Sequence, residues 1–261
     1  MASSLIGGLL AQGDIAATDI MLFDPNTSAT RKLADEYGIV VSSDNQSLVL
    51  NSDVVIIAVK PQVLQSVLEA IAVPFKEKQP LTISIAAGIT IDSIERWLDG
   101  DYPVVRVMPN TPALIGKGAS GLYANQRVSQ AQRELAESLI SSVGCAVWVN
   151  NEGDIDSVTA LSGSGPAYFM LFIQGLIEAA ERAGLDSDTA KTLAVQTAAG
   201  AAELVASSDA SLQTLIDNVT SPNGTTEQGL QSFAKDDLKG TVQNAFNAAK
   251  QRSVELAKEL A

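Results

Sequence analysis

Val54-Val55-Ile56-Ile57-Ala58-Val59-Lys60-Pro61 is the stretch that decides the fold. Its first six residues are apolar without alternation, which predicts a strand buried on both faces of a parallel sheet. Lys60 and Pro61 then mark the start of a helix, since proline is favoured at the first helical position. Amphipathic segments separate it from similar β-branched runs at 20–23, 39–41, 81–85, 104–108, 119–123 and 145–149. This alternation predicts a doubly wound, Rossmann-like α/β domain with a parallel sheet.

The strand pattern ends after Asn150. Helical patterns rich in small residues follow at 167–183, 189–207, 211–218, 225–235 and 241–260. We therefore predict a dinucleotide-binding domain over 1–150 and an all-α domain over 151–261.

The composition excludes several classes of chemistry. The 261 residues are 46% hydrophobic and 18% charged, which is typical of a folded protein. The absence of histidine excludes a Ser-His-Asp triad, and with a single cysteine, Cys145, no metal site is predicted. The net charge of −13 repels phosphate backbones and anionic membrane surfaces, so we expect neither nucleic acid nor a membrane as a partner.

Two apolar stretches resemble targeting or membrane segments in length or composition. No Lys or Arg precedes Arg31, so the stretch 5–10 lacks the basic flank of a secretory signal. The uncharged stretch 157–177 contains Ser162-Gly163-Ser164-Gly165-Pro166, which is expected to break it and leave a run too short for a bilayer. We expect a cytoplasmic protein.

The beginning of the sequence departs from the usual doubly wound plan. Such domains start with a strand and a glycine-rich turn, whereas the first pattern here is a helix over 3–12. We therefore expect the sheet to lack its first strand, as in an N-terminally truncated domain. Gly7 and Gly8 lie inside the helical pattern and are expected to allow close packing of this helix on the sheet.

Three strand ends are candidates for a cofactor crevice. They are 58–61, Ala86-Ala87-Gly88 and Pro109-Asn110-Thr111-Pro112. In open α/β sheets, ligands bind outside the carboxyl ends of the strands. Alone, the segment 58–61 is better explained as an ordinary strand-to-helix turn, but three such ends on adjacent strands favour a binding crevice.

Two further loops contain candidate ligand contacts. The segment 162–166 is either a tight turn between helices or a close backbone contact for a ligand. The segment 218–228 is rich in Ser, Thr and Asn, and Thr225 with Gln228 predicts a capping box. Free N–H groups at such a helix start favour a carboxylate, although a capped helix alone explains the box.

Together these segments resemble the pyrroline-5-carboxylate reductase family. The most specific part is 218–228 with Leu230, and the segments 58–61, 108–112 and 160–168 match in order and spacing. The resemblance covers the whole chain. It implies an α/β domain followed by a helical dimerisation domain, and reduction of the cyclic imine 1-pyrroline-5-carboxylate to L-proline with NADPH or NADH. It also implies a homo-oligomer, at least a dimer through the helical domain.

The resemblance further implies roles for individual residues. The cofactor-binding set is Met1, Asp24, Asn26, Asn45, Ala58, Val59, Lys60, Pro61, Ile85, Ala87 and Asn218. The substrate-binding set is Ser221, Gly224, Thr225, Thr226 and Asp209, with Thr226 as the catalytic residue because its hydroxyl would reach the imine nitrogen. Asp24 stands where an acid accepts the ribose 2′-OH of NAD, whereas Asn26 and its polar neighbours could bind a 2′-phosphate, so the cofactor preference stays open.

Two alternatives remain at this point. One is a related β-hydroxyacid dehydrogenase or imine reductase, but the dehydrogenases need a catalytic lysine, and the helix over 167–181 contains none. The other is a catalytically silent dimer that has lost its nucleotide site.

Overall fold

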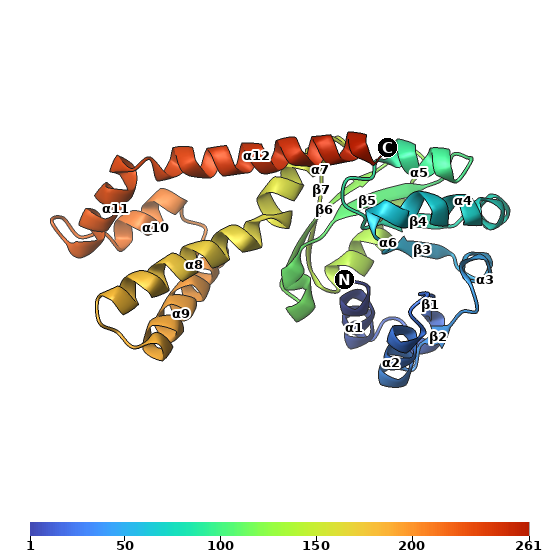
Figure 1. Ribbon diagram of the computed structural model, residues 1–261, viewed down its shortest axis with the longest axis horizontal. Coiled ribbons are helices and arrows are strands. Elements are labelled where there is room, and N and C mark those ends of the chain that lie inside the picture. The colour runs from blue at the N-terminus through green and yellow to red at the C-terminus, as the bar shows by residue number, and fades with distance from the viewer. Residues whose placement is uncertain (261) are drawn as a thin grey trace. The chain divides into compact units, whose positions relative to one another are not determined.

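The computed structural model describes residues 1–260 and divides them into two compact units (Figure 1). The first unit comprises Met1–Ser164 and the C-terminal residues from Ala249, and the second comprises Gly165–Ala248. The strands are β1 (Met21–Leu22), β2 (Val40–Val41), β3 (Val54–Ile57), β4 (Leu81–Ser84), β5 (Val104–Met108), β6 (Gly118–Ala124) and β7 (Gly144–Trp148).

Helices connect these strands and form the whole second unit. The first unit contains α1 (Ala2–Gln12), η1 (Ala17–Asp19), α2 (Thr27–Tyr37), α3 (Asn45–Leu50), α4 (Pro61–Lys78), α5 (Ile91–Trp97), η2 (Thr111–Ile115), α6 (Gln130–Ser141), α7 (Asp154–Val158) and the π-helix η3 (Thr159–Gly163). The remaining helices are α8 (Gly165–Arg182), α9 (Ser187–Ala206), α10 (Leu212–Asn218), α11 (Thr225–Lys235) and α12 (Leu238–Glu259). The α/β domain followed by helices is thus confirmed.

The larger sheet has the strand order β3-β4-β5-β6-β7. Its pairs are parallel except that β6 runs antiparallel to β5, with Val105 opposite Ala124. The expectation of an entirely parallel sheet is therefore wrong at β6. The reason is the short connection through η2, because a parallel neighbour needs a long crossover whereas an antiparallel one needs only a turn.

The side chains of β3 alternate between two hydrophobic clusters. Val55 and Ile57 are buried in one cluster together with residues of α4 and α5, and Val54 and Ile56 pack against the other, which includes residues of α1 and α6. Helices therefore cover both faces of the sheet, as the unbroken apolar run predicts. Each fully buried Leu, such as Leu64 of α4, stabilises the fold by about 1.5 to 3 kcal/mol.

The strands β1 and β2 form a separate parallel pair, drawn apart from the larger sheet in Figure 1. Among residues 1–260, no strand pairing joins this pair to β3. The described residues therefore form two separate sheets, and the expected absence of a first strand stays a prediction.

Gly8 allows a close approach between α1 and the turn after α6. A Cβ at this position would lie 2.6 Å from the carbonyl oxygen of Ser142 and 2.7 Å from Val143 Cγ1. A glycine is thus needed at position 8 because this turn, and not a strand of the sheet as expected, lies against it. At Gly7 a Cβ would meet only the end of the Tyr37 side chain, at 3.1 Å.

The predicted break at 162–166 is wrong. Helical structure runs over 29 residues, Asp154–Arg182, and by length and composition this stretch could cross a membrane. The π-helix accommodates the small residues, because the N–H of Ser164 donates to the carbonyl of Thr159 at 2.8 Å. The hydroxyls of Thr159 and Ser162 also donate to carbonyls one turn earlier, at 2.8 and 3.1 Å.

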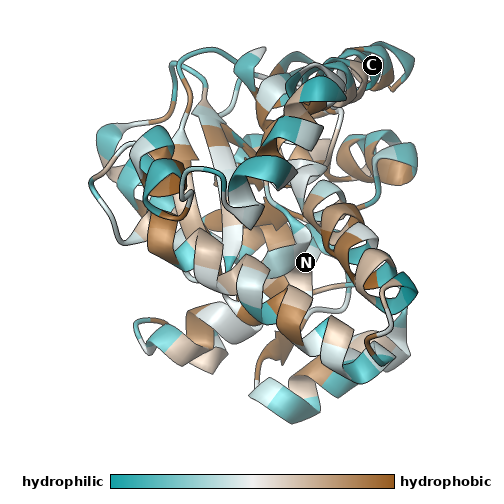
Figure 2. Ribbon diagram, turned by 90° about the vertical axis from the view of Figure 1, so that its left-hand side faces the viewer, coloured by the Kyte–Doolittle hydropathy of each residue, from teal (hydrophilic) through white to brown (hydrophobic). Residues whose placement is uncertain are grey.

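The second unit exposes many apolar side chains. In α8, Phe169, Met170 and Leu171 are 74%, 62% and 69% exposed. Inside the unit, the rings of Phe172 and Phe233 lie 5.9 Å apart and join α8 to α11. Figure 2 shows hydrophobic positions in brown along these helices. Such a surface is typical of a protein interface.

Candidate active site

The turns after β3 and β4 lie side by side at the carboxyl edge of the larger sheet. The N–H of Ile85 donates to the carbonyl of Ile57 at 3.1 Å, which fixes the two strand ends together. Five of the predicted cofactor residues lie in these turns: Ala58, Lys60 and Ala87 are exposed, whereas Val59 and Ile85 are half-buried. The two turns thus lie together at one edge of the sheet, and a binding crevice in front of them stays a prediction.

Helix α4 starts at this edge. Lys60 is its N-cap and Pro61 its first residue, and neither a side-chain cap nor an acidic residue occupies the first turn. Pro61 has no N–H and the N–H of Val63 donates to the carbonyl of Lys60 at 3.1 Å, so this end of α4 presents mainly the positive end of the helix dipole.

Asp24 and Asn26 lie in the loop between β1 and α2. A carboxylate oxygen of Asp24 accepts the N–H of Asn26 at 2.7 Å, and the Asn26 side chain in turn caps α2 by accepting from Ala29 at 3.3 Å. Both side chains are exposed. The loop is thus ordered by its own hydrogen bonds, and the Asp24 carboxylate is held on the solvent side of the loop.

Asn45 is the first residue of α3. The preceding Asp44 caps this helix, with its Oδ1 accepting the N–H of Ser47 at 2.7 Å. This hydrogen bond lowers the pKa of Asp44 below its ordinary value. The cap therefore fixes the backbone position of Asn45 at the start of α3.

The end of β5 is bonded to the π-helix. Asn110 donates through Nδ2 to the carbonyl of Ser162 at 3.0 Å and accepts the N–H of Ala119 at 2.9 Å. A Cβ on Gly163 would lie 2.5 Å from Met108 Cε, so only glycine fits without movement of Met108. The structure thus brings together two segments that the sequence singled out separately, 108–112 and 162–166.

One ion pair in this region was missed by sequence reasoning. Arg106 of β5 is only 3% exposed, and its Nη1 lies 3.1 Å from Glu152 Oε1, just before α7. The same oxygen accepts the N–H of Ile91 at 2.8 Å. The signal was present, since a charged residue inside the apolar run 104–108 needs a buried partner.

The loop between α10 and α11 contains most of the predicted substrate residues. The N–H of Gly224 donates to the carbonyl of Ser221 at 2.9 Å, which closes a tight turn. Asn223 has a φ of 58°, and its N–H donates to Glu227 Oε2 at 2.8 Å. This turn sets the direction in which the loop enters α11.

The predicted capping box is wrong. The N-cap of α11 is Gly224, without a side-chain cap, and Thr225 and Thr226 are the first two helical residues. The physical reason is that the 221–224 turn lets the helix begin one residue earlier than the box requires, and Glu227 reaches back to the loop where Gln228 was expected to do so. Both threonines are exposed, so their hydroxyls face solvent.

Asn218 and Asp209 belong to the same unit as this loop. Asn218 is the last residue of α10, whereas Asp209 lies in the exposed connection between α9 and α10. Among the residues that the structure describes, Asp209 makes no hydrogen bond to the loop 221–226. Its role beside the substrate stays a prediction.

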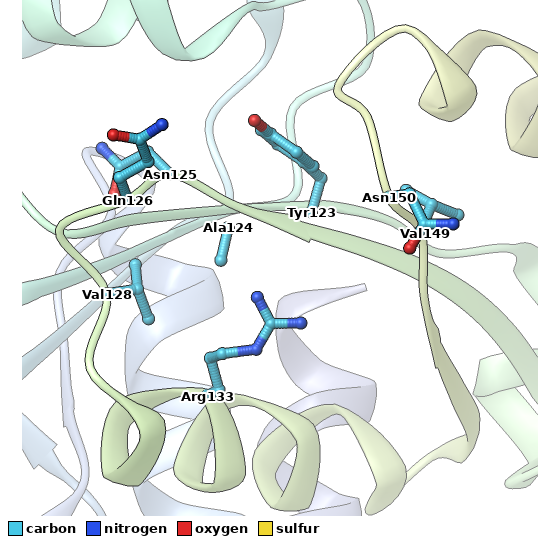
Figure 3. A pocket seen from close by; sticks show the side chains of 8 residues that line it. All are labelled: Tyr123, Ala124, Asn125, Gln126, Val128, Arg133, Val149 and Asn150. Carbon is cyan, nitrogen blue, oxygen red and sulfur yellow. The ribbon is translucent and has the colours of Figure 1, made fainter.

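A pocket of about 380 Å³ lies where β6 and β7 end (Figure 3). Arg133 points into it, with its guanidinium carbon 4.0 Å from the centre of the Trp148 ring. Because β6 is antiparallel to β5, its carboxyl end lies at the sheet edge opposite the carboxyl end of β5. None of the predicted site residues lines this pocket, whose wall is Tyr123, Ala124, Asn125, Gln126, Val128, Arg133, Val149 and Asn150.

Two family profiles match the chain. Residues 152–256 match the family described as "Pyrroline-5-carboxylate reductase dimerisation", and residues 1–88 match "NADP oxidoreductase coenzyme F420-dependent". The chain therefore carries a dimerisation domain after a nucleotide-binding region.

Curated and solved relatives match over nearly the full length. A pyrroline-5-carboxylate reductase of Pseudomonas aeruginosa is 50% identical over 260 residues, covering 100% of this chain and 94% of the relative. The structure of a pyrroline-5-carboxylate reductase from Coxiella burnetii superposes with a TM-score of 0.93 at 39% identity, covering 98% of this chain and 94% of that one. The Plasmodium falciparum pyrroline carboxylate reductase, solved with NADP bound, has a TM-score of 0.84 at 34% identity and covers 98% and 94%.

Proposed function

The chain belongs to the pyrroline-5-carboxylate reductase family, and from that premise we infer that it reduces 1-pyrroline-5-carboxylate to L-proline in proline biosynthesis. The observation that carries this function is the 50% identity to the Pseudomonas aeruginosa reductase across the whole chain. The reaction needs no histidine, because the hydride acceptor is a protonated imine and no hydroxyl proton has to be removed.

NADPH or NADH supplies the hydride when bound. Three features of the chain fit such a cofactor. The turns after β3 and β4 carry small or exposed residues at a strand edge, and α4 starts there without an acidic residue. The first turn of α1 also lacks an acidic residue, and the buried hydroxyl of Ser4 has no hydrogen-bond partner within residues 1–260. An anionic group at the start of α1, next to Met1, would be favoured by the helix dipole.

We assign the cofactor to Met1, Asp24, Asn26, Asn45, the turn 58–61, Ile85 and Ala87, with Asn218 contributing from the helical part. Exposure of Ala58, Lys60 and Ala87 supports this assignment. Asp24 would accept the ribose 2′-OH of NADH and repel the 2′-phosphate of NADPH. The Asn26 side chain is an uncharged amide and would not repel that phosphate. The family relative with NADP bound supports use of the phosphorylated cofactor.

We assign the substrate to Ser221, Gly224, Thr225, Thr226 and Asp209. The start of α11 supports this assignment, because it has no side-chain cap and its one acidic first-turn residue, Glu227, is bonded to the N–H of Asn223, which leaves the N–H groups of the first turn to receive a carboxylate. The hydroxyl of Thr226 is exposed and could donate a proton toward the imine nitrogen. These residues would orient the ring and its charge, which is the main task of the protein in such a reaction.

We propose that the domains divide as 1–150 for the dinucleotide and 151–261 for dimerisation and substrate. We also propose a homodimer through the helical domain. The exposed apolar residues of α8 support this, since association would remove them from water. The same association accounts for the apolar stretch Asp154–Arg182 without a membrane, and we place the enzyme in the cytoplasm.

We further propose that one more parallel strand belongs between β1 and β3. The separation of the two sheets supports the proposal, because β1 and β3 each have one edge without a strand partner among residues 1–260. A strand followed by a glycine-rich turn would enter the start of α1 and complete a phosphate-binding site. Cofactor affinity equal to that of a version carrying such a strand would contradict this proposal.

A substrate panel tests the function. In the reductive direction, purified protein is given NADPH or NADH together with either 1-pyrroline-5-carboxylate or an acyclic imine. In the oxidative direction, it is given NADP⁺ or NAD⁺ together with short β-hydroxyacids. We expect cofactor oxidation only with the pyrroline. Oxidation of a hydroxyacid without reduction of the pyrroline would replace this function by that of a β-hydroxyacid dehydrogenase.

A further inference from the structure

We propose that Glu152 is a positioning residue for the reductase reaction, an inference that rests on the function proposed above. One oxygen, Oε1, accepts from the N–H of Ile91 at 2.8 Å and from Arg106 Nη1 at 3.1 Å. We call this arrangement the Glu152 junction. It joins the loop after β4, the strand β5 and the residues that lead into α7.

The burial of Arg106 argues for a geometric role. Its side chain is 4% exposed, and that of Glu152 is 28% exposed. A buried ion pair is a weak source of stability, because desolvation offsets most of the attraction, and apolar residues of similar size often stabilise a fold equally well. What apolar residues cannot provide is a fixed, directional link from one oxygen to two donors.

On one side, the junction fixes the turn that carries two predicted cofactor residues. Ile91 is the first residue of α5 and follows Ile85, Ala87 and Gly88 closely in the chain. Gly88 has a φ of 75°, and a Cβ there would lie 3.3 Å from Leu260 Cδ1, so the C-terminal end of the described chain packs against the same turn. The turn is thus held by the Glu152 carboxylate at its end and by Leu260 over its middle.

On the other side, the junction fixes the π-helix against the end of β5. The segment from Glu152 to Gly163 is attached to β5 at two places: at its start through Arg106, and at its end through Asn110 and Met108. Single π-helical turns are frequent at functional sites. The hydroxyl of Ser253 also donates to Asp156 Oδ1 at 2.6 Å, so removal of the first attachment would loosen the start of this segment while Asp156 and Ser162 stay bonded.

Loss of the Glu152 junction should therefore lower the catalytic constants more than it lowers the stability of the fold. Displacement of site residues by about 1 Å can lower a rate on the order of a hundred-fold. Loss of the bond to Ile91 should raise the KM for NADPH, and loss of the link to β5 should lower kcat. The two links can be separated, because a glutamine at 152 keeps an oxygen for Ile91 but loses the charge that pairs with Arg106.

The test compares the wild type with three variants of the full chain. The double variant R106M/E152M removes both charges together, so no unpaired charge stays buried. R106M/E152Q restores only the oxygen for Ile91. The control R127M/E95M removes the ion pair between Arg127 and Glu95 of α5, at 3.5 Å, together with the bond from Arg127 to the exposed Asp101, and in the described chain neither residue is bonded to Glu152. Thermal midpoints and oligomeric state are measured with kcat and both KM values.

We expect R106M/E152M to unfold at a temperature similar to that of the control, with kcat/KM for NADPH lower by roughly ten- to a hundred-fold. R106M/E152Q should recover the KM for NADPH but not kcat. Equal kinetic constants for R106M/E152M and the control would overturn the proposal. If R106M/E152M fails to fold, R106M/E152Q replaces it, because the oxygen for Ile91 is kept and only the link to β5 is lost; wild-type kcat in R106M/E152Q would overturn the proposal equally. An inactive wild type would instead refute the function on which the proposal rests.

Discussion

Replacement of Thr226 by valine removes one hydroxyl from the start of α11 and keeps the shape of the side chain. Thr226 is the second residue of α11, it is exposed, and the helix is not capped by a side chain. The substitution therefore breaks no cap. We expect the thermal midpoint to stay close to that of the wild type, with only the small change typical of a surface position.

The magnitude follows from the single hydrogen bond that would be lost. A neutral hydrogen bond contributes about 0.5 to 1.5 kcal/mol and one to a charged group about 1.5 to 3 kcal/mol. The value of kcat/KM for the pyrroline should accordingly fall by roughly two-fold to somewhat over a hundred-fold. A loss in the upper part of this range would indicate that the hydroxyl contacts the iminium or the carboxylate.

The assay is steady-state oxidation of NADPH with the pyrroline varied, and Thr192→Val is the matched control. Thr192 is also an exposed helical threonine, in α9, and it belongs to neither predicted set. Wild-type kcat/KM in Thr226→Val would remove Thr226 from the site. An equal loss in Thr192→Val would show that the effect is not specific to the substrate.

Three further outcomes are expected. Asp24→Ser should raise the ratio of kcat/KM for NADPH to that for NADH several-fold, because a carboxylate next to the 2′-phosphate is removed; an unchanged ratio would place this side chain away from the ribose. Gly8→Ala should destabilise the fold by about 1 to 3 kcal/mol in chemical denaturation, whereas Gly7→Ala, which meets only a movable side-chain end, should not. The pKa of Asp44 is lowered in the folded protein, so its carboxylate stabilises the fold above the ordinary aspartate pKa, and this stability is lost as the pH falls through the lowered pKa. Asp44→Asn keeps the cap but cannot titrate, so the free energy of unfolding should depend less on pH in the acid range.

The sequence was sufficient for most elements because local patterns determine them. The β-branched runs and Pro61 place β3, α4 and the turn between them within one or two residues. The direction of β6 was not predictable from periodicity, because an apolar run looks the same in a parallel and an antiparallel strand. The length of the connection was the signal that decided it.

The sequence could indicate the candidate site only where its residues are adjacent in the chain. The turn 58–61 and the loop 221–226 are local, and their exposure agrees with binding. The contacts of Asn110 with Ser162 and of Arg106 with Glu152 join residues far apart in the chain, so no local pattern reveals them. The capping box failed because the positive φ of Asn223 and the turn 221–224 shift the helix start, which composition alone does not reveal.

Transfer of a labelled hydride tests the central claim most directly. The protein is incubated with 1-pyrroline-5-carboxylate and NADPH that carries deuterium at the transferable position of the nicotinamide, and the product is examined by mass spectrometry and NMR. The proposed function predicts L-proline that carries one deuterium, bound at C5. The experiment is done with NADPH labelled on either face of the nicotinamide. Absence of proline, or proline without deuterium from both labelled cofactors, would contradict the proposed function.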